Sequence, residues 1–472
     1  MIGIIGAGMS GLFAARALAR TGHAVTLFET DAPPPSQEAD PAFLDWQRAG
    51  VAQFRQPHSA RSIIPKVLKQ QDPDLLQAMI DEGMVPWTFH LYSVEDDAIG
   101  HDPELVGLLG RRPTLEVPLR RVTEATPGVT IVRKPVKGLV FEEAGGRRRV
   151  AGVVTADGTM RFDAVVDASG RRSKIADWLD AAGFGKPYEE SSDCGIVYYS
   201  RYFRFHPGVS IPRGAYPSGP SASLPSVHYT MNRTDHSTFS VMLGVAPWRE
   251  EFKGLRHDAA FMNFVGQLPD AIKWLDAAVS SPIWKVEPFA GLTNRYRQFA
   301  PGGVPIVDDL YVMGDARFHT NPIHGWGMSF AMQMGYMLAD ALAAGRDSRQ
   351  STAALERAAD PYARSYYDTA THEDAARMEL WKAGGPGTDR GEPGSYRYFL
   401  TTVMPAVFKD QWIFRKVTRR LHLLDDPKDV LNDEEVLRRA DRIGATTNQR
   451  FSETQLLAMA VEATKHQMAP NA

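Results

Sequence analysis

The stretch MIGIIGAGMSGLFAARALARTGHAVTLFET, residues 1–30, decides the fold class of this chain. Residues 2–5 form a short apolar run that predicts a buried strand, and a glycine-rich turn follows it directly. The Ala- and Leu-rich residues 12–20 predict a helix, which Gly22 ends. Residues 25–29 then predict a second strand. Strand, helix and strand in this order predict a βαβ unit, and therefore an α/β fold with a parallel sheet.

The turn at residues 6–11, Gly-Ala-Gly-Met-Ser-Gly, has the spacing G-x-G-x-x-G. Gly6 permits the tight turn, Gly8 lets the backbone approach a pyrophosphate, and Gly11 lets helix and strand pack closely. The start of a helix also presents N–H groups and a positive dipole end to phosphates. Glu29 ends the second strand, where an acid can bind a ribose hydroxyl. This unit predicts a site for an adenine dinucleotide, either FAD or NAD. Its candidate residues are Gly6, Gly8, Met9, Ser10, Gly11 and Glu29.

The whole chain has the composition of an ordinary globular protein. It has 472 residues, of which 43% are hydrophobic and 23% are charged, and its formal net charge is −3. This length is about three times the ~150-residue prior for one domain. Because no strong global charge exists to hold a polyanion, we expect no nucleic-acid partner. Cys194 is the single cysteine, so an internal disulfide and a thiolate metal site are both excluded.

The apolar segments indicate the cellular location of the protein. Gly6 already belongs to the glycine turn, which leaves no room for the charged and apolar regions of a signal peptide. The longest weakly charged stretch, residues 325–344, contains Gln333 and Asp340 and suits a packed helix better than a membrane span. We therefore expect a cytoplasmic protein without a membrane span.

A second motif lies some 300 residues after the first. A short apolar strand at 310–313 runs into GDARFHTNPIHGWGMSFA, residues 314–331. A strand that ends in Gly-Asp, followed by Pro and by a Gly-x-Gly that opens a long helix, resembles the signature of the FAD-dependent monooxygenase superfamily with the para-hydroxybenzoate hydroxylase fold. The resemblance favours FAD as the dinucleotide. It also implies that Asp315 binds the ribityl chain of FAD.

The resemblance gives the start of the second long helix a role as well. In that family, the helix start points its N–H groups at the pyrimidine end of the isoalloxazine. Reduced flavin is anionic there, and a helix N-terminus stabilises negative charge. By this match, the second part of the cofactor site consists of Pro322, Gly325, Gly327 and Met328.

Two further stretches resemble the same family. Residues 111–120, RRPTLEVPLR, are similar to the segment S-R-x-x-L-x-x-x-L, whose arginine lies near the cofactor phosphates, and this arginine corresponds to Arg112. Residues 51–58, VAQFRQPH, are similar to the loop that enters the flavin site after the first βαβ unit. Nearby, Arg48, Arg55 and His58 could face the cofactor, and each could equally cap a loop.

The chain also departs from the family. Many aromatic hydroxylases of this fold carry an Asp-Gly motif that serves both FAD and NAD(P)H, whereas residues 167–170 are Asp-Ala-Ser-Gly, with Ser169 in place of that Asp. Reduction by NAD(P)H directly and reduction by a separate flavin reductase therefore both remain open. The W-x-W-x-I-P motif of tryptophan halogenases is absent, and residues 280–285 do not supply it. Halogenation is therefore a minor alternative.

The region 190–300 carries the candidate substrate sheet. Strands are expected at 195–205, 223–231 and 237–246, and helices near 257–267 and 270–279. Their aromatic residues suit a sheet over an apolar ligand, and they suit ordinary sheet packing equally. These are Tyr198, Tyr199, Tyr202, Phe203, Tyr229 and Phe239.

The expected protein is an α/β flavoprotein with a GxGxxG FAD-binding domain, an inserted β-sheet substrate domain and a helical C-terminal region. The boundaries are 1–190 and 296–350 for the FAD domain, 191–295 for the substrate domain and 351–472 for the helical region.

By resemblance, the reaction is hydroxylation or epoxidation of an apolar or aromatic small molecule through a flavin hydroperoxide, with NAD(P)H or a partner flavin reductase as the reductant. A phenolic substrate would need a base, for which His58, His319 and His324 are the candidates. An FAD-dependent dehydrogenase or reductase is the alternative, and a flavin carrier without turnover is a third reading. No metal ligands with a recognisable spacing are present.

Overall fold

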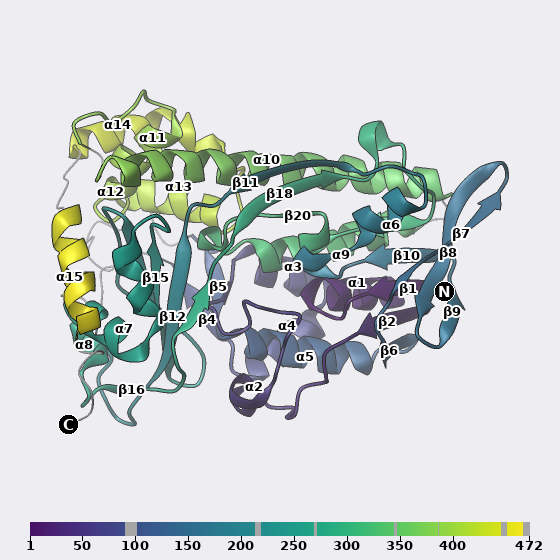
Figure 1. Cartoon of the computed structure of the whole chain (residues 1–472), viewed down its shortest axis with the longest axis horizontal. Helices are drawn as coiled ribbons and strands as arrows, with labels where there is room; N and C mark the ends of the chain where they lie inside the picture. The colour runs from purple at the N-terminus through teal and green to yellow at the C-terminus, as the bar shows by residue number, and fades with distance from the viewer. Residues whose placement is uncertain are drawn as a thin grey trace.

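The computed structural model describes residues 1–89, 102–212, 219–268, 271–343, 347–385, 387–444 and 451–465 (Figure 1).

A five-stranded parallel sheet forms the centre of the cofactor half of the molecule. Its order is β19-β10-β1-β2-β6. The strands are β1 (Ile2–Ile5), β2 (Val25–Glu29), β6 (Val129–Arg133), β10 (Ala164–Asp167) and β19 (Leu310–Val312). All four pairings are parallel. The predicted α/β fold is confirmed, and one edge of the sheet comes from a strand some 300 residues beyond the first.

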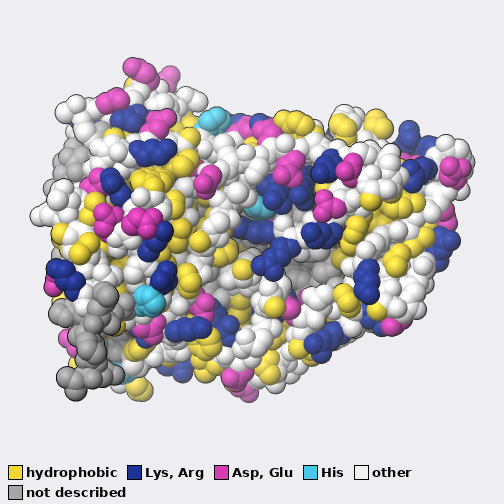
Figure 2. Space-filling view, viewed as in Figure 1, with side chains coloured by type: hydrophobic (Ala, Val, Ile, Leu, Met, Phe, Trp, Pro, Cys, Tyr) yellow, Lys and Arg dark blue, Asp and Glu magenta, His cyan; other side chains and the backbone are white. Residues whose placement is uncertain are grey.

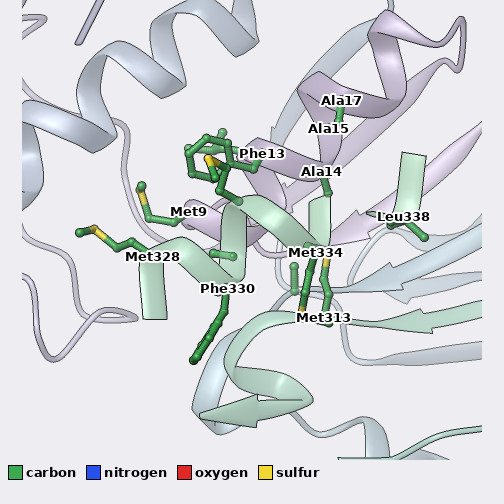
Figure 3. Close-up of a cluster of buried hydrophobic side chains, with 14 of the residues drawn as sticks. Met9, Phe13, Ala14, Ala15, Ala17, Met313, Met328, Phe330, Met334 and Leu338 are labelled. Atoms are coloured by element: carbon green, nitrogen blue, oxygen red, sulfur yellow. The ribbon is translucent and has the colours of Figure 1, made fainter. Parts of the chain in front are cut away.

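Two helices from distant parts of the chain pack together beside this sheet. They are α1 (Met9–Arg20), which follows the glycine turn, and α9 (Gly327–Leu342), which follows the second motif. A Cβ on Gly335 would lie 3.0 Å from the backbone nitrogen of Ala14, so the two helices approach each other closely. Figure 3 shows Met9 and Phe13 of α1 next to Met328 and Phe330 of α9. The two sequence motifs therefore lie side by side, joined by one apolar core.

The second half contains a six-stranded sheet with antiparallel pairings. Its path is β13-β14-β15-β12-β16, and β17 pairs with β12. The bounds are β12 (Val197–Phe205), β13 (Ser221–Leu224), β14 (Val227–Arg233), β15 (Thr238–Val245), β16 (Ser280–Pro282) and β17 (Glu287–Phe289). A smaller sheet of β11 (Tyr188–Asp193), β18 (Thr293–Gln298) and β20 (Phe318–His319) leads back to the cofactor half.

The expected strands at 195–205 and 237–246 are confirmed, whereas the expected strand at 223–231 is a hairpin of β13 and β14 with a turn at 225–226. The helices of this region are shorter than expected. The first helix is α7 (Asp258–Val265), which begins directly after His257. The second is α8 (Ile272–Leu275), and the expected start at 270 lies outside the described residues.

The C-terminal region is helical, as predicted. It consists of α10 (Ser348–Lys382), α11 (Tyr396–Tyr398), the π-helix η7 (Phe399–Val403), α12 (Met404–Ala406), α13 (Gln411–Leu421), α14 (Glu434–Ile443) and α15 (Glu453–Lys465). The long helix α10 runs along β11 and β18, whereas α15 lies apart beside α7 and α8 (Figure 1). Leu456 and Ala460 of α15 belong to the same buried cluster as Phe261 of α7, so α15 completes the core of the antiparallel half.

The remaining elements surround these layers. They are α2 (Ala39–Asp45), β3 (Ser59–Ala60), α3 (Ile63–Gln71), α4 (Pro73–Asp81), β4 (Val85–Thr88), β5 (Val106–Leu109), α5 (Arg112–Glu124), β7 (Gly138–Ala144), β8 (Arg147–Thr155), β9 (Gly158–Arg161), α6 (Ile175–Ala181) and the short helical turns η2 (Gly170–Arg172), η3 (Glu250–Arg256), η4 (Pro301–Gly303), η5 (Gly314–Ala316), η6 (Pro322–His324) and η8 (Asp429–Leu431). Within the described part of the chain, no helix is both long and apolar enough to cross a membrane.

Candidate functional site

A cavity of about 1150 Å³ connects the two halves of the molecule. Its first end is lined by the glycine turn and Glu29, and its middle by the loop from Asp315 to Gly327. Its far end lies between strands β13 and β14 and the C-terminal helices. On the face of the molecule drawn in Figure 2, Lys and Arg side chains gather near the centre of that face. Both sequence motifs therefore line one continuous space.

The glycine turn has the geometry that its spacing predicts. Gly6 has φ +100°, and a Cβ there would lie 2.7 Å from the carbonyl oxygen of Ala168. A Cβ on Gly11 would lie only 1.9 Å from the Gly6 oxygen, so helix α1 packs directly on the turn. By contrast, a Cβ on Gly8 would meet no atom within 4 Å. Gly8 is also the N-cap of α1 and has no side-chain capping bond, so the helix start is open to the cavity.

Glu29 is held in a buried ion network at the end of β2. Its Oε1 accepts hydrogen bonds from the backbone nitrogens of Thr30 (2.7 Å) and Asp31 (3.0 Å). Its Oε2 lies 3.2 Å from Nη1 of Arg48, which also pairs with Asp31 at 3.1 Å. The nearby carboxylates, Glu116 foremost, raise the pKa of Arg48 against the opposing effect of its burial. A fixed negative charge therefore stands at the expected ribose position.

Arg112 reaches the same network from the start of α5. Its Nε donates to Oε2 of Glu116 at 2.7 Å, while Nη2 of Arg48 donates to Oε1 of the same carboxylate at 2.5 Å. Glu116 is buried, and its pKa is lowered because Arg48 and Arg112 outweigh the effect of burial. Arg48 and Arg112 both line the cavity. One buried carboxylate thus holds two guanidinium groups at the first end.

Asp315 lies where β19 ends and the turn η5 begins. It lines the cavity, and its Oδ2 lies 3.4 Å from Nε of Arg171. Gly314 before it has φ +58°, and a Cβ there would lie 2.1 Å from Oγ of Ser10. Because Ser10 belongs to the glycine turn, the second motif is seated directly on the first.

Ser169, which stands where the family's Asp-Gly motif has Asp, follows the end of β10. Ser169 Oγ donates to Oδ1 of the buried Asp167 at 2.6 Å. Burial raises the pKa of Asp167, although hydrogen bonds from Ser169 and Ser173 oppose the rise. Ser169 thus presents a hydroxyl to the cavity where the family motif has a carboxylate.

The start of α9 forms the middle of the cavity. Gly325 has φ +66°, and a Cβ there would lie 2.5 Å from Nη2 of Arg61. Arg61 donates from this nitrogen to the carbonyl oxygen of His324 at 2.7 Å. Trp326 is the N-cap of α9 and makes no side-chain capping bond, and a Cβ on Gly327 would meet no atom within 4 Å. A second helix start is therefore open to the cavity, next to the lining residue Met328.

A buried polar network holds this loop between the two halves. Asn321 accepts a hydrogen bond from the Tyr198 hydroxyl of β12 at 2.6 Å and donates to Asp374 of α10 at 2.6 Å. Its backbone nitrogen donates to Asn294 of β18 at 2.7 Å. Arg377 of α10 lies 2.8 Å from Asp374. The sequence does not predict this network, because its members come from four separate segments.

All three candidate histidines line the cavity, and burial lowers the pKa of each. The pKa of His58 falls to about 3, with Arg112 as a further cause, and its Nδ1 lies 2.7 Å from the carbonyl oxygen of Gln56. The pKa of His319 falls to about 4, and its Nδ1 lies 3.0 Å from the carbonyl oxygen of Asp315. Since a carbonyl oxygen only accepts, the proton of both rings is on Nδ1.

His324 has a different setting. Its ring stacks on Trp326 with 4.2 Å between centroids, and its Nδ1 lies 3.5 Å from a carboxylate oxygen of Glu373. Among the described residues its Nε2 has no hydrogen-bond partner. Each of the three histidines is therefore neutral near pH 7.

Some sequence candidates lie elsewhere. Arg55 is not among the residues that line the cavity. It donates to the carbonyl oxygens of Phe43 and Leu44, both at 3.0 Å, and its guanidinium lies 4.0 Å from the Trp284 ring centroid. The loop-capping alternative therefore describes Arg55, because carbonyl groups and an aromatic face surround it.

The aromatic residues of the antiparallel sheet mostly pack inside it. Of the six, Tyr229 lines the cavity. Phe203 and Phe239 stack at 5.2 Å in the buried core, and the Tyr202 hydroxyl donates to the carbonyl oxygen of Gln56 at 3.1 Å. Sheet packing is thus the main role of these rings. Because successive side chains of a strand alternate, Tyr198 and Tyr202 lie on one face of β12, and Tyr199 and Phe203 lie on the other.

The comparisons with known proteins agree with this geometry. Residues 4–34 match the family described as the NAD(P)-binding Rossmann-like domain. The chain is 28% identical over 361 residues to Protein Rv3254 of Mycobacterium tuberculosis strain H37Rv, a match that covers 71% of each chain.

Among solved structures, PqsL of Pseudomonas aeruginosa, a probable FAD-dependent monooxygenase, superposes with a TM-score of 0.59 at 15% identity, over 80% of this chain and 96% of that one. The flavin-dependent brominase Bmp2 superposes with a TM-score of 0.53 at 16% identity, over 99% of both chains. Residues 4–34 therefore match the NAD(P)-binding Rossmann-like domain, and the chain as a whole shares its fold with PqsL and Bmp2.

Proposed function

We propose that this protein is an FAD-dependent monooxygenase that hydroxylates or epoxidises an apolar or aromatic small molecule. The observation that carries the proposal is the single cavity that runs from the glycine turn past Asp315 to the open start of α9. By the family resemblance, the glycine turn binds the dinucleotide, Asp315 binds the ribityl chain, and the start of α9 faces the flavin ring. A carrier without turnover would have no need of the large space beyond them.

The residues present fit FAD at the level of local geometry. Gly8 and Gly327 are the two positions in the motifs where an added Cβ would meet nothing, and both face the cavity. Both helix starts lack a side-chain cap, so their first N–H groups are available to an anionic ligand. The first suits the pyrophosphate, and the second suits the pyrimidine end of the isoalloxazine.

Bound FAD would supply the redox chemistry with O2, and the chain would position it. Glu29 and Arg48 would hold the ribose, Arg112 would attract the phosphates, and Asp315 would accept a hydrogen bond from the ribityl chain. Gly6, Met9, Ser10 and Pro322 complete the two turns that carry these groups. The dipole at the start of α9 would stabilise negative charge on the reduced ring.

A proton acceptor is needed if the substrate is a phenol. We propose His58, His319 and His324 for this role, because all three line the cavity in the neutral form. We also propose that residues 1–190 and 296–350 form the cofactor domain around the substrate domain 191–295, followed by the helical region 351–472. The pairing of β19 with β10 supports this division.

The reductant is either NAD(P)H or a separate flavin reductase. Ser169 supports the second of these, because the carboxylate of the family's shared FAD and NAD(P)H motif is missing at that position.

The test is the absorption spectrum of the purified protein after incubation with FAD, followed during addition of NADH, NADPH or a flavin reductase. We expect a bound flavin spectrum and oxygen uptake that depends on substrate. A colourless protein with no affinity for FAD would contradict the cofactor. Turnover under strictly anaerobic conditions without an oxygenated product would instead support the dehydrogenase or reductase alternative.

A further inference from the structure

The far end of the cavity has a polar wall made by strands β13 and β14. His228, Thr230 and Asn232 alternate along β14 and line the cavity together. Ser223 and Ser221 of β13 lie opposite His228 and Thr230, and both also line the cavity. Because side chains alternate between the two faces of a strand, this face carries a row of hydroxyl, amide and imidazole groups.

An apolar wall of the same cavity comes from the C-terminal helices. Leu400 of the π-helix η7, Met404 and Pro405 of α12, and Phe408 and Phe414 beyond them all line the cavity. Turns of π-helix are rare and are frequently found at functional sites. The π-turn therefore points to a ligand site at this wall, independently of the apolar residues in it.

Two arginines near this end are already paired with carboxylates. Arg377 lies 2.8 Å from Asp374, and Arg420 lies 2.6 Å from Glu373. The Arg420 guanidinium also sits 4.6 Å from the Phe399 ring centroid. The two arginines are thus held by carboxylates, and the polar row of the sheet supplies uncharged hydrogen-bonding groups to a ligand.

His228 belongs to that row as an uncharged group. Its Nδ1 lies 3.0 Å from Oγ of Ser223. Burial, with a contribution from Arg377, lowers the pKa of His228 to about 4. The imidazole is therefore neutral near pH 7 and can donate or accept a hydrogen bond.

The two walls are separate from the groups assigned to the dinucleotide. Those groups lie in residues 6–58, at Arg112 and in residues 315–328, whereas the far end is built from residues 221–232 and 399–421. The cavity of about 1150 Å³ also exceeds the roughly 300–1,000 Å³ of a typical small-molecule site. The lining of the cavity thus continues past the groups assigned to the dinucleotide.

We propose that the far end is the substrate compartment and that it selects a neutral amphipathic molecule. The apolar body of this molecule packs against η7, α12 and α13, and one edge with a hydroxyl, amino or carbonyl group bonds to the row on β13 and β14. This inference rests on the proposed function, because the compartment opens onto the flavin-facing loop. It assigns substrate selection to residues 399–421.

Three bicyclic probes test the compartment: naphthalene, 2-naphthol and 2-naphthoate. Each is titrated into the full-length protein incubated with FAD, and binding is followed by flavin absorbance and by tryptophan fluorescence, since Trp326 and Trp381 line the cavity. We expect 2-naphthol to bind about tenfold more tightly than naphthalene, as one good hydrogen bond contributes about 1.4 kcal/mol. We expect 2-naphthoate to bind more weakly than 2-naphthol, because the arginines are already paired. Equal affinities for the three probes, or no binding, would overturn the proposal.

Two matched pairs of variants locate the two walls. Met404→Gln places an amide in the apolar wall, and its control is Met378→Gln, a half-buried methionine of α10 outside the cavity lining. We expect Met404→Gln to weaken both naphthalene and 2-naphthol about tenfold, through the cost of burying an unbonded amide, and Met378→Gln to leave both unchanged. Equal effects of the two substitutions would contradict the apolar wall.

The polar wall is tested by His228→Leu, with His206→Leu as the control outside the cavity lining. We expect His228→Leu to remove the preference for 2-naphthol over naphthalene while naphthalene still binds. A preference that persists would contradict the role of the strand row. The flavin spectrum of each sample distinguishes a loss of cofactor binding from a loss of naphthol binding. Naphthol binding without any flavin binding contradicts the proposed function alone, and flavin binding without naphthol binding contradicts the compartment alone.

Discussion

The two ends of the cavity are built in opposite ways. The dinucleotide end depends on one turn of six residues, in which Gly6 and Gly11 touch each other and Gly8 stays open. The far end has no local motif: strand residues 221–232 meet helical residues 399–421 there. A backbone turn specifies its own geometry, whereas a compartment between two elements exists only after both have packed.

The two sheets differ in the same way. All four strands that flank or form the first βαβ unit, β1, β2, β6 and β10, pair in parallel, and β1 and β2 are fully buried. On β14, by contrast, buried residues alternate with less buried ones. The first sheet is covered on both faces, whereas the second lines the cavity with His228, Thr230 and Asn232 of one face of β14 and with Tyr229 of the other.

Substitution in the glycine turn should have the largest effect. Gly11→Ala would place a methyl group 1.9 Å from the Gly6 oxygen, so we expect the free energy of unfolding to fall by about 4 kcal/mol or more. Gly8→Ala is the matched control, because its methyl group meets no atom. We expect near-normal stability and weaker FAD binding for Gly8→Ala. Urea unfolding and FAD titration measure both quantities, and equal stabilities would break the distinction drawn between the two glycines.

The ion network behind the turn should give the next largest effect. Glu116→Gln leaves Arg48 and Arg112 buried without their shared carboxylate, and we expect a loss of about 3 kcal/mol in the free energy of unfolding. Glu124→Gln breaks a pair with Arg120 in which the glutamate is 42% exposed, and its effect should stay below about 1 kcal/mol. Similar urea midpoints for the two variants would show that the buried network contributes little.

Asp315 tests the middle of the cavity. We expect Asp315→Ala to weaken FAD binding about tenfold with little loss of stability, since the carboxylate that would accept a hydrogen bond from the ribityl chain is lost. Asp177→Ala, on the exposed side of α6, is the control. FAD affinity is read from flavin fluorescence during titration. If both variants bind FAD as the original protein does, Asp315 has no part in holding the cofactor.

The smallest effect concerns pH and His58. Because the pKa of His58 in the folded protein is about 3 and that of an unfolded histidine is about 6.5, the unfolded chain binds more protons below pH 6.5. The contribution of neutral His58 to stability is therefore complete above about pH 6.5 and is lost as the pH falls toward 3. Between pH 7 and pH 5, His58→Gln should lose about 1–2 kcal/mol less than the original protein. Urea unfolding at both pH values, with the exposed His257→Gln as the control, measures this difference, and parallel losses in all three proteins would refute it.

Residues whose role follows from backbone geometry could be predicted, and residues whose role follows from packing could not. Gly6, Gly8, Met9 and Ser10 of the turn and the acid Asp315 line the cavity, because a strand end and a helix start determine where they point. Gly11 lies under the turn and does not line the cavity. Arg55 lies only three residues from His58, yet it bonds to carbonyl oxygens away from the cavity. No pattern within the loop separates these two positions.

The residues at the far end of the cavity could not be predicted from the sequence either. The period of β14 predicts two faces, but it does not say which of them meets a second wall. Val227, Tyr229 and Met231 of one face belong to the core of their own domain, and the polar face lines the same cavity as residues 399–421, some 170 residues later in the chain. Asn321 and Asp374 likewise meet across 53 residues, and no local signal relates them.

The sequence by itself determined the βαβ unit, the spacing of the glycines and the second motif, because these depend on the conformations that neighbouring residues permit. Only the tertiary structure decided that β19 joins β10, that Gly314 sits on Ser10, and that a π-helix lines the far end of the cavity. The physical reason is that side chains distant along the chain are brought together by burial of apolar surface, which acts between whole elements and leaves no fixed spacing in the sequence.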